Sequence, residues 1–240
     1  MRRIAHISDL HFGTEDPAVA AGLLEDLALQ SPHLVVVSGD LTQRARRGQF
    51  QAAKAYLDRI QVPKLIVPGN LDIPLYHLLD RFLRPLENYR RWISDDRQPF
   101  FHDDEIAVAG VDNTRPGNWK EGSISLAQIQ TIQDQFASVA PELFKVLVSH
   151  HPFIPPKRNV KAALVGRVRP ALKMLEAAGC ALILAGHLHH AYSGDVRPYH
   201  LEIARSILVA QAGTSISHRR RDEIRGAKSI GWRIRYAALR

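Results

Sequence analysis

Five short apolar runs in this chain each end in a residue that can bind a metal, and this regularity restricts the fold more than any other feature. The runs span residues 4–8, 34–37, 64–67, 144–148 and 181–184. They are followed, in order, by Asp9 and His11, Asp40, Asn70, His150, and His187 and His189. Because each run is short, apolar and bounded by polar residues, we expect five buried β-strands.

Segments with helical spacing alternate with these runs. Asp16 and Pro17 suit the cap and first position of a helix, and residues 48–60, 125–136 and 167–178 are further expected helices. Strands that alternate with helices predict an α/β fold with a mainly parallel sheet and helices on its faces. Sites in such sheets form at the carboxyl ends of the strands. We therefore expect the seven polar side chains to gather at one edge.

The remaining segments are less regular. Pro74 and Pro85 interrupt residues 73–98, for which we expect one or two short helices. Residues 100–101 and 106–111 suggest a hairpin, and residues 206–210 and 230–236 suggest antiparallel strands. No repeat or linker is evident, so we expect a single domain over residues 1–240.

Composition restricts the class of protein. The chain is 45% hydrophobic and 23% charged, as is typical of soluble globular domains. No run approaches the roughly 18 apolar residues of a membrane span, and the N-terminus is too short before its first polar residue for a signal peptide. Cys180 is the only cysteine and cannot form an internal disulfide, which favours a reducing, cytoplasmic location.

The formal net charge of +8 favours anionic partners such as phosphate esters, nucleic acid or acidic membrane surfaces. Nucleic acid is the less favoured partner, because the arginines form no evident patch interleaved with aromatic residues.

The seven strand-end residues indicate a metal site. Carboxylates, imidazoles and one amide make a larger set than the four ligands of a single zinc ion. A shared carboxylate can bridge two ions roughly 3.5–4 Å apart, as in two-metal hydrolysis. Nitrogen and oxygen ligands without thiolates suit manganese, iron, zinc or cobalt.

In sequence order, these motifs resemble those of the calcineurin-like metallophosphoesterases. The matching motifs are Asp9-Leu10-His11, Gly39-Asp40, Gly69-Asn70, Ser149-His150-His151-Pro152 and Gly186-His187-Leu188-His189. The resemblance is closest to small bacterial class III cyclic-nucleotide and glycerophosphodiester phosphodiesterases. It implies a four-layer αββα sandwich of mixed sheets, with a dinuclear metal site at the carboxyl ends of the strands.

The resemblance also implies a ligand set. Asp9, His11, Asp40 and His189 would hold the first metal. Asp40 would bridge to a second metal completed by Asn70, His150 and His187. His151 is the alternative to His150, which is nearer the strand end.

The implied activity is hydrolysis of a small phosphorylated metabolite, either a phosphodiester or a phosphomonoester, by in-line attack of a metal-bound hydroxide. Asn70, Arg44, Arg115 and Asn118 are candidate contacts for the substrate phosphate. The last three could equally be exposed loop residues.

One position departs from the family pattern. The usual motif is Gly-Asn-His followed by an acidic residue, whereas this chain has Gly69-Asn70-Leu71-Asp72. The missing histidine normally lies near the leaving group, where acid–base assistance is worth about 10²–10⁴-fold. We therefore expect metal binding with reduced turnover, and Asp72 and His77 are candidate proton donors. The alternatives are a nuclease-type phosphodiesterase and a non-catalytic protein that binds metal or nucleotide.

Overall fold

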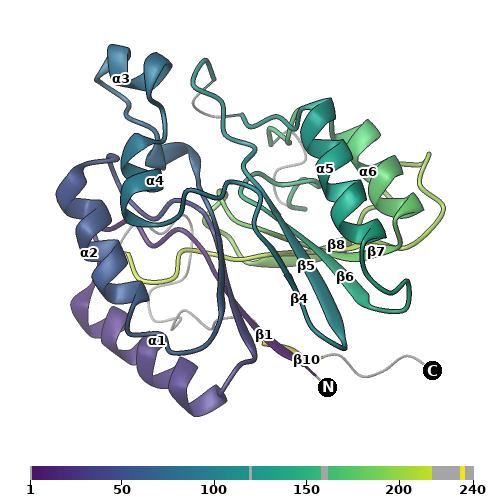
Figure 1. The fold of residues 1–240 in the computed structure, drawn as a ribbon, viewed down its shortest axis with the longest axis horizontal. Helices are drawn as coiled ribbons and strands as arrows, with labels where there is room; N and C mark the ends of the chain where they lie inside the picture. Colours follow the sequence, from purple (N-terminus) through teal and green to yellow (C-terminus); the bar gives the residue numbers. More distant parts are fainter. Residues whose placement is uncertain (1, 119–120, 158–161, 218–232, 236–240) are drawn as a thin grey trace.

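Two β-sheets lie face to face, and helices cover the outer side of each (Figure 1). The computed structural model describes residues 2–118, 121–157, 162–217 and 233–235. Its order of layers, helix–sheet–sheet–helix, is the αββα sandwich that the motifs implied.

The first sheet has the order β10-β1-β2-β3. Its parallel strands are β1 (Arg3–Ile7), β2 (Leu34–Ser38) and β3 (Lys64–Val67), and β10 (Arg233–Arg235) pairs antiparallel with β1. The carboxyl ends of the three parallel strands therefore lie at one edge.

The second sheet has the order β4-β5-β6-β7-β9-β8. Its central strands β5 (Ile106–Val111), β6 (Phe144–Ser149), β7 (Cys180–Ala185) and β9 (Leu208–Gln211) are parallel. The edge strands β4 (Phe100–His102) and β8 (Tyr192–Asp195) are antiparallel to their neighbours. The sheet is thus mixed, with a parallel centre.

Six α-helices are described. They are α1 (Pro17–Gln30), α2 (Arg47–Leu57), α3 (Leu78–Leu83), α4 (Glu87–Trp92), α5 (Leu126–Ala137) and α6 (Val168–Ala177), and a 3₁₀ turn spans Asn70–Asp72. Helices α1, α2 and α4 cover the outer side of the first sheet, and helices α5 and α6 cover that of the second (Figure 1). Asp16 caps α1 by accepting hydrogen bonds from Ala18 and Val19, as its sequence predicted.

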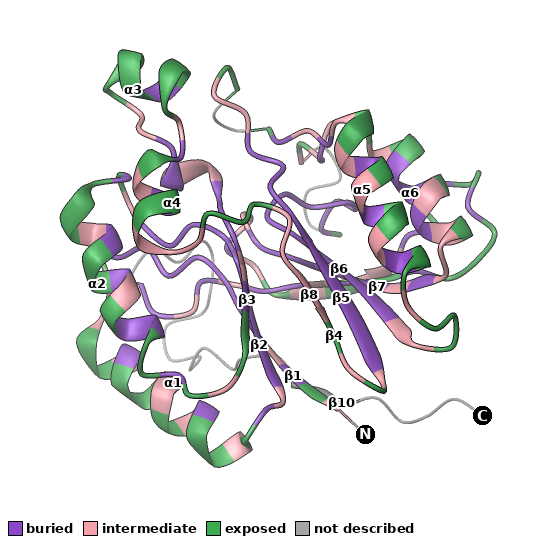
Figure 2. Cartoon of the chain, in the orientation of Figure 1, coloured by how far each residue is buried: buried purple, intermediate pink, exposed green. Residues whose placement is uncertain are grey.

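Three apolar layers fill the spaces between these four layers. Side chains alternate along β2, so that Leu34 and Val36 pack between the sheets while Val35 and Val37 pack with α1 and α2. Strands β5, β6 and β7 repeat the alternation, and their second apolar face packs against α5 and α6. A strand buried on both faces reads as a continuous apolar run, which explains the sequence pattern. Figure 2 shows the burial that results.

The expected strands lie where the sequence placed them, to within one or two residues. The alternation of strands and helices predicted one mainly parallel sheet, whereas the chain forms two. Strands β1 to β3 belong to the first sheet, and strands β4 to β9 belong to the second. The prediction for residues 206–210 is wrong in part, since β9 is antiparallel to β8 but parallel to β7. Of residues 230–236, only Arg233–Arg235 lie among the described residues. The single-domain organisation stays a prediction.

Within the described parts of the chain, no helix combines the length and the apolar character needed to cross a membrane.

Candidate metal centre

The seven predicted residues come together where the carboxyl ends of the two sheets meet. Asp9 and His11 follow β1, Asp40 follows β2, and Asn70 follows β3. From the second sheet, His150 follows β6, and His187 and His189 follow β7. Two overlapping groups of donor atoms, each within 4.8 Å of one another, could hold metal ions. They are Asp9, His11 and His189, and Asp9, Asp40 and His150.

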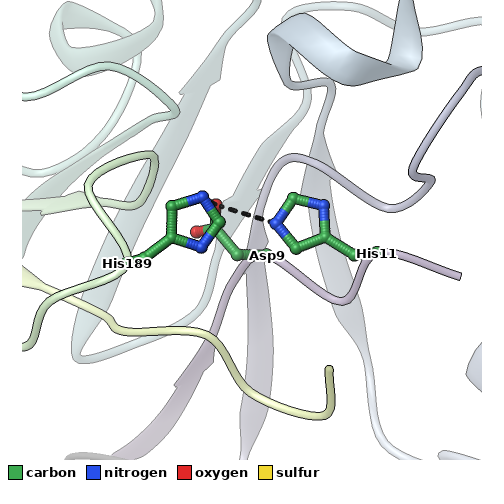
Figure 3. Close-up of side chains that lie close together, drawn as sticks. All are labelled: Asp9, His11 and His189. Atoms are coloured by element: carbon green, nitrogen blue, oxygen red, sulfur yellow. Dashed lines mark ion pairs between the residues drawn. The ribbon is translucent and has the colours of Figure 1, made fainter. Parts of the chain in front are cut away.

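The first group surrounds one carboxylate oxygen (Figure 3). Oδ1 of Asp9 lies 3.6 Å from Nε2 of His11 and 3.7 Å from Nε2 of His189. The two imidazoles are stacked, with centroids 4.9 Å apart. All three residues are buried, and Asp9 Oδ1 accepts no hydrogen bond from any described residue. A buried carboxylate oxygen without a donor is costly, and a cation at this point would compensate that cost.

The second group converges on His150. Its Nε2 lies 3.0 Å from Oδ1 of Asn70, 3.3 Å from Nδ1 of His187 and 3.4 Å from Oδ1 of Asp40. Oδ1 of Asn70 also lies 2.9 Å from Nδ1 of His187. Asn70 and His187 are only partly buried, so these two residues, which lie outside the buried group of Asp9, Asp40 and His150, are on the solvent side of the centre.

The two groups share Asp9, whereas the motifs gave the bridging role to Asp40. Oδ1 of Asp40 accepts a hydrogen bond from the backbone N–H of Leu71 at 2.8 Å. The bridging role of Asp40 stays a prediction.

Five of the seven residues have a left-handed backbone. The φ angles are 55° for Asp9, 51° for His11, 51° for Asp40, 77° for His187 and 60° for His189. This conformation is uncommon outside glycine and clusters at functional sites, where the surrounding structure holds it. The strand ends thus turn sharply and aim these side chains at a common centre.

Two glycines allow the loops to approach one another. A Cβ on Gly186 would lie 1.9 Å from Oγ of Ser8, and one on Gly69 would lie 2.2 Å from Oδ1 of Asp40. Both distances are impossible for real side chains, so the glycines before His187 and Asn70 are required by packing.

Residues that contact the candidate ligands hold them in a fixed orientation. Ser8 Oγ donates to Oδ2 of Asp9 at 2.6 Å, and Nδ1 of His150 lies 2.7 Å from the carbonyl oxygen of Ser38. Nδ1 of His189 lies 2.6 Å from Oγ1 of Thr214. Such partners fix the ring that presents its other nitrogen to a metal. Sequence reasoning missed them, because single serines and threonines carry no spacing signal.

The electrostatics suit metal ligands. Burial lowers the pKa of His150, which keeps its imidazole neutral at neutral pH. Burial opposes ionisation of Asp9, but His189, His150, His11 and the Ser8 hydroxyl together hold its pKa below the ordinary value. Neutral imidazoles and an ionised carboxylate are the protonation states that bind metals.

His151 lies beside this centre. Its Nδ1 lies 2.9 Å from Oδ1 of Asn113, and its ring centroid lies 4.6 Å from that of His187. Nε2 of His151 is buried without a hydrogen-bond partner among the described residues. The donor group with Asp9 and Asp40 contains His150 and not His151, and the choice of His150 as the ligand stays a prediction.

The two candidate proton donors occupy different surroundings. Asp72 is buried and accepts hydrogen bonds from the backbone N–H groups of Gly69, Leu41 and Thr42 at 2.9–3.1 Å. Burial raises its pKa to about 6, while these hydrogen bonds act in the opposite direction. Through these hydrogen bonds, Asp72 connects the loop after β2 with the loop after β3. His77 is exposed at the start of α3. The catalytic role of either residue stays a prediction.

The candidate phosphate contacts are dispersed. Arg44 is exposed and lines a cavity of about 390 Å³ together with His77. Arg115 donates to the carbonyl oxygen of Thr114 and to Gln128. Asn118 is exposed and donates to Glu121.

Three arginines lie over aromatic rings, and the low preference for nucleic acid stays a prediction. The guanidinium of Arg44 lies 5.3 Å from the ring centroid of Tyr76, and those of Arg47 and Arg91 lie 5.6 and 5.8 Å from that of Trp92. Arg44 and Tyr76 are distant in sequence, and Arg47 and Trp92 lie on different helices, whereas Arg91 and Trp92 are neighbours on α4.

Three comparisons with known structures concern the fold alone, because the sequence identities are low. A dimetal phosphatase from Danio rerio matches with a TM-score of 0.65 and 14% identity, covering 90% of this chain and 88% of the other. A purple acid phosphatase from yellow lupin matches with a TM-score of 0.68 and 12% identity, over 90% of this chain and 44% of the other. TT1561 of Thermus thermophilus matches with a TM-score of 0.55 and 13% identity, over 89% of each chain.

Sequence comparisons identify the family. Glycerophosphodiester phosphodiesterase GpdQ of Enterobacter lignolyticus is 28% identical over 165 residues, which is 63% of this chain and 57% of that protein. The match therefore spans little more than half of the relative's length. The family model for the calcineurin-like phosphoesterases matches residues 2–191. The chain thus belongs to the calcineurin-like phosphoesterase family.

Proposed function

We propose that this protein is a metal-dependent phosphoesterase that hydrolyses a small phosphodiester or phosphomonoester. The convergence of carboxylate, imidazole and amide donors around the buried Asp9 is the observation that carries the proposal. Five of these residues are held in a left-handed backbone, an arrangement that is costly to maintain without a function.

The proposed ligand set divides between two ions. Asp9, His11, Asp40 and His189 would hold the first, and Asn70, His150 and His187, together with Asp40, would hold the second. Manganese, iron and zinc all fit this mixture of nitrogen and oxygen donors. When bound, such ions lower the pKa of water and neutralise charge on the phosphoryl oxygens.

The chain's own residues position this chemistry. Oδ2 of Asp9 is fixed by Ser8 and by the backbone N–H of His187, which leaves Oδ1 for a metal. Asn70 offers a neutral oxygen to a metal while its amide N–H groups remain able to contact a phosphate. Its partial exposure supports this role.

The proposed enzyme has a limited hydrolysis rate, because Leu71 occupies the position of the family's usual histidine. A leucine cannot protonate a leaving group, so esters of poor leaving groups should react slowly. Asp72 and His77 remain the candidate donors. The hydrogen bonds that Asp72 accepts favour a role in holding the loops, and the exposure of His77 favours it as the donor.

The relative in the sequence comparison is named for a glycerophosphodiester substrate, which supports a phosphodiester for this chain. The test is a panel of phosphomonoesters, cyclic nucleotides, glycerophosphodiesters and single-stranded DNA, assayed with Mn²⁺. We expect hydrolysis of a small ester that is lost in Asp40→Asn. The matched control is Asp58→Asn, which alters an exposed aspartate paired with Lys54.

Three outcomes would contradict the proposal. Hydrolysis that persists in metal-loaded Asp40→Asn would place the chemistry elsewhere. Metal binding without hydrolysis of any ester would make the chain a binding protein. A preference for DNA, with affinity falling steeply as salt rises, would favour the nuclease alternative.

A further inference from the structure

Helix α3 and the turn before it expose a cluster of large apolar side chains. We call Tyr76, Leu78, Leu79, Phe82 and Leu83 the α3 patch. Their exposed fractions range from 59% for Phe82 to 77% for Leu79. Scattered apolar residues on a surface are ordinary, but a contiguous group of this size marks an interaction site.

Helix α3 buries a charged side chain and exposes its apolar ones, which is the reverse of an ordinary surface helix. Its one buried side chain is Arg81, which donates to the carbonyl oxygen of Pro74 at 3.1 Å, while its leucines and phenylalanine point outward. Figures 1 and 2 show α3 standing clear of the sheets beyond α4, with its surface mainly exposed. Burying an arginine while exposing four apolar residues costs free energy, which contact with an apolar phase would recover.

Positive charge lies beside the α3 patch. Arg44, Arg46 and Arg47 line the cavity that separates the loop after Asp40 from the segment leading into α3. They and Arg91 form no ion pair with any residue that the structure describes, whereas Arg84 pairs with Glu87 and Arg90 with Asp95. Asp80 is the acidic side chain that also lines the cavity. Arginines therefore outnumber acidic groups around the patch.

We propose that the α3 patch docks on the surface of an anionic phospholipid bilayer. Leucine, phenylalanine and tyrosine would enter the boundary between headgroups and acyl chains, and the arginines would contact the lipid phosphates. Basic residues near an anionic membrane are attracted to its surface charge. A second copy of this chain fits less well, because a symmetric contact through α3 would bring like-charged arginines together.

The α3 patch lies in the same connection of the chain as one of the candidate metal ligands. Asn70 and α3 belong to the same connection between β3 and β4, and Arg44 follows Asp40 in the loop after β2. Helix α3 is therefore close in sequence to the predicted ligand Asn70, and Arg44 is close in sequence to the predicted ligand Asp40. The docking itself does not depend on hydrolysis, and its test reads binding alone.

The test is sedimentation of the full chain with vesicles of phosphatidylcholine alone and of phosphatidylcholine mixed with phosphatidylglycerol. We expect binding to the mixed vesicles, weakened by salt. The double substitution Leu79→Gln/Leu83→Gln should weaken it about tenfold or more, because neither position would then bury an apolar side chain in the bilayer. Both positions are exposed, so the fold should survive, and circular dichroism checks this.

Two matched controls accompany the variant. Leu29→Gln/Leu201→Gln removes two leucines that are at least as exposed but lie outside the patch, and should leave binding unchanged. Arg46→Gln/Arg47→Gln should weaken binding to the mixed vesicles, whereas Arg169→Gln, on α6, should not.

Three results would overturn the proposal. These are an absence of binding to the mixed vesicles, equal losses in the patch and control variants, and concentration-dependent dimerisation that Leu79→Gln/Leu83→Gln abolishes. The last result, read by sedimentation velocity, would assign the patch to a second copy of the chain.

Discussion

The backbone N–H of His187 donates a hydrogen bond to Oδ2 of Asp9 at 3.0 Å, although 178 positions separate the two residues. Asp9 follows β1 of the first sheet and His187 follows β7 of the second. This contact joins the two halves of the candidate metal centre, so its geometry controls whether their donors can share an ion.

Gly186 permits this contact, and its substitution should disrupt the centre. In Gly186→Ala the new Cβ would meet Ser8 Oγ and would lie 2.8 Å from Oδ2 of Asp9. We expect metal affinity to fall about 10–100-fold, as when supporting groups at a metal site are lost. Isothermal titration with Mn²⁺ measures this. Gly22→Ala is the control, because nothing lies within 4 Å of its Cβ, and unaltered affinity in Gly186→Ala would contradict the geometry.

Thr214 should matter through His189. Its Oγ1 lies 2.6 Å from Nδ1 of that ring, so Thr214→Val would free the imidazole to rotate. We expect metal affinity to fall about 10-fold or more while the fold is retained. Thr131→Val is the matched control, because Thr131 is only partly buried and its Oγ1 donates to the carbonyl oxygen of Ala127 within α5. Equal affinities in the two variants would show that Thr214 does not orient the ring.

Leu71→His should restore the missing leaving-group assistance. Leu71 is partly exposed, and its backbone N–H already contacts Asp40, so an imidazole at this position lies close to the centre. We expect at least about tenfold faster hydrolysis of an ester with a poor leaving group, with a smaller gain on aryl esters. Leu126→His, on the exposed face of α5, controls for the added histidine. An unchanged rate in metal-loaded protein would show that Leu71 does not limit turnover.

His6 should make stability depend on pH. Its ring is buried against Oγ of Ser38 at 2.8 Å, and burial lowers its pKa from 6.5 to about 4. Because the unfolded chain then binds the proton more readily, His6 stabilises the fold above pH 6.5, and this contribution is lost as the pH falls toward 4. The full loss is about 3 kcal/mol.

Urea unfolding across this pH range measures that loss. His6→Gln should unfold with a shallower pH dependence between pH 6.5 and 4 than the parent chain, even where it is less stable overall. His102→Gln, at an exposed position, should keep the parent's dependence. An identical slope in His6→Gln would mean that His6 does not carry the effect.

The strand-end residues could be predicted because buried parallel strands produce short apolar runs, and the residue after each run must lie at the same edge. The division into two sheets could not be predicted from this spacing, because runs such as those at β3 and β5 look alike whichever sheet they join. Family motifs supplied that part. Strand β8 was missed because Tyr192–Asp195 is short, contains Gly194 and lacks an apolar run.

Contacts between distant residues were equally hidden. Ser8 and Thr214 orient ligands from positions that no pattern marks. The residues of α3 have the composition of a helix with a buried face, and only their three-dimensional placement shows that Arg81 is inside and Leu79 outside.

Anomalous diffraction from crystals soaked in manganese tests the central claim most directly. The account predicts two peaks at the shared sheet edge, one near Asp9, His11 and His189 and the other near Asn70, His150 and His187. An absence of peaks there, or a single peak elsewhere in a well-ordered crystal, would contradict it.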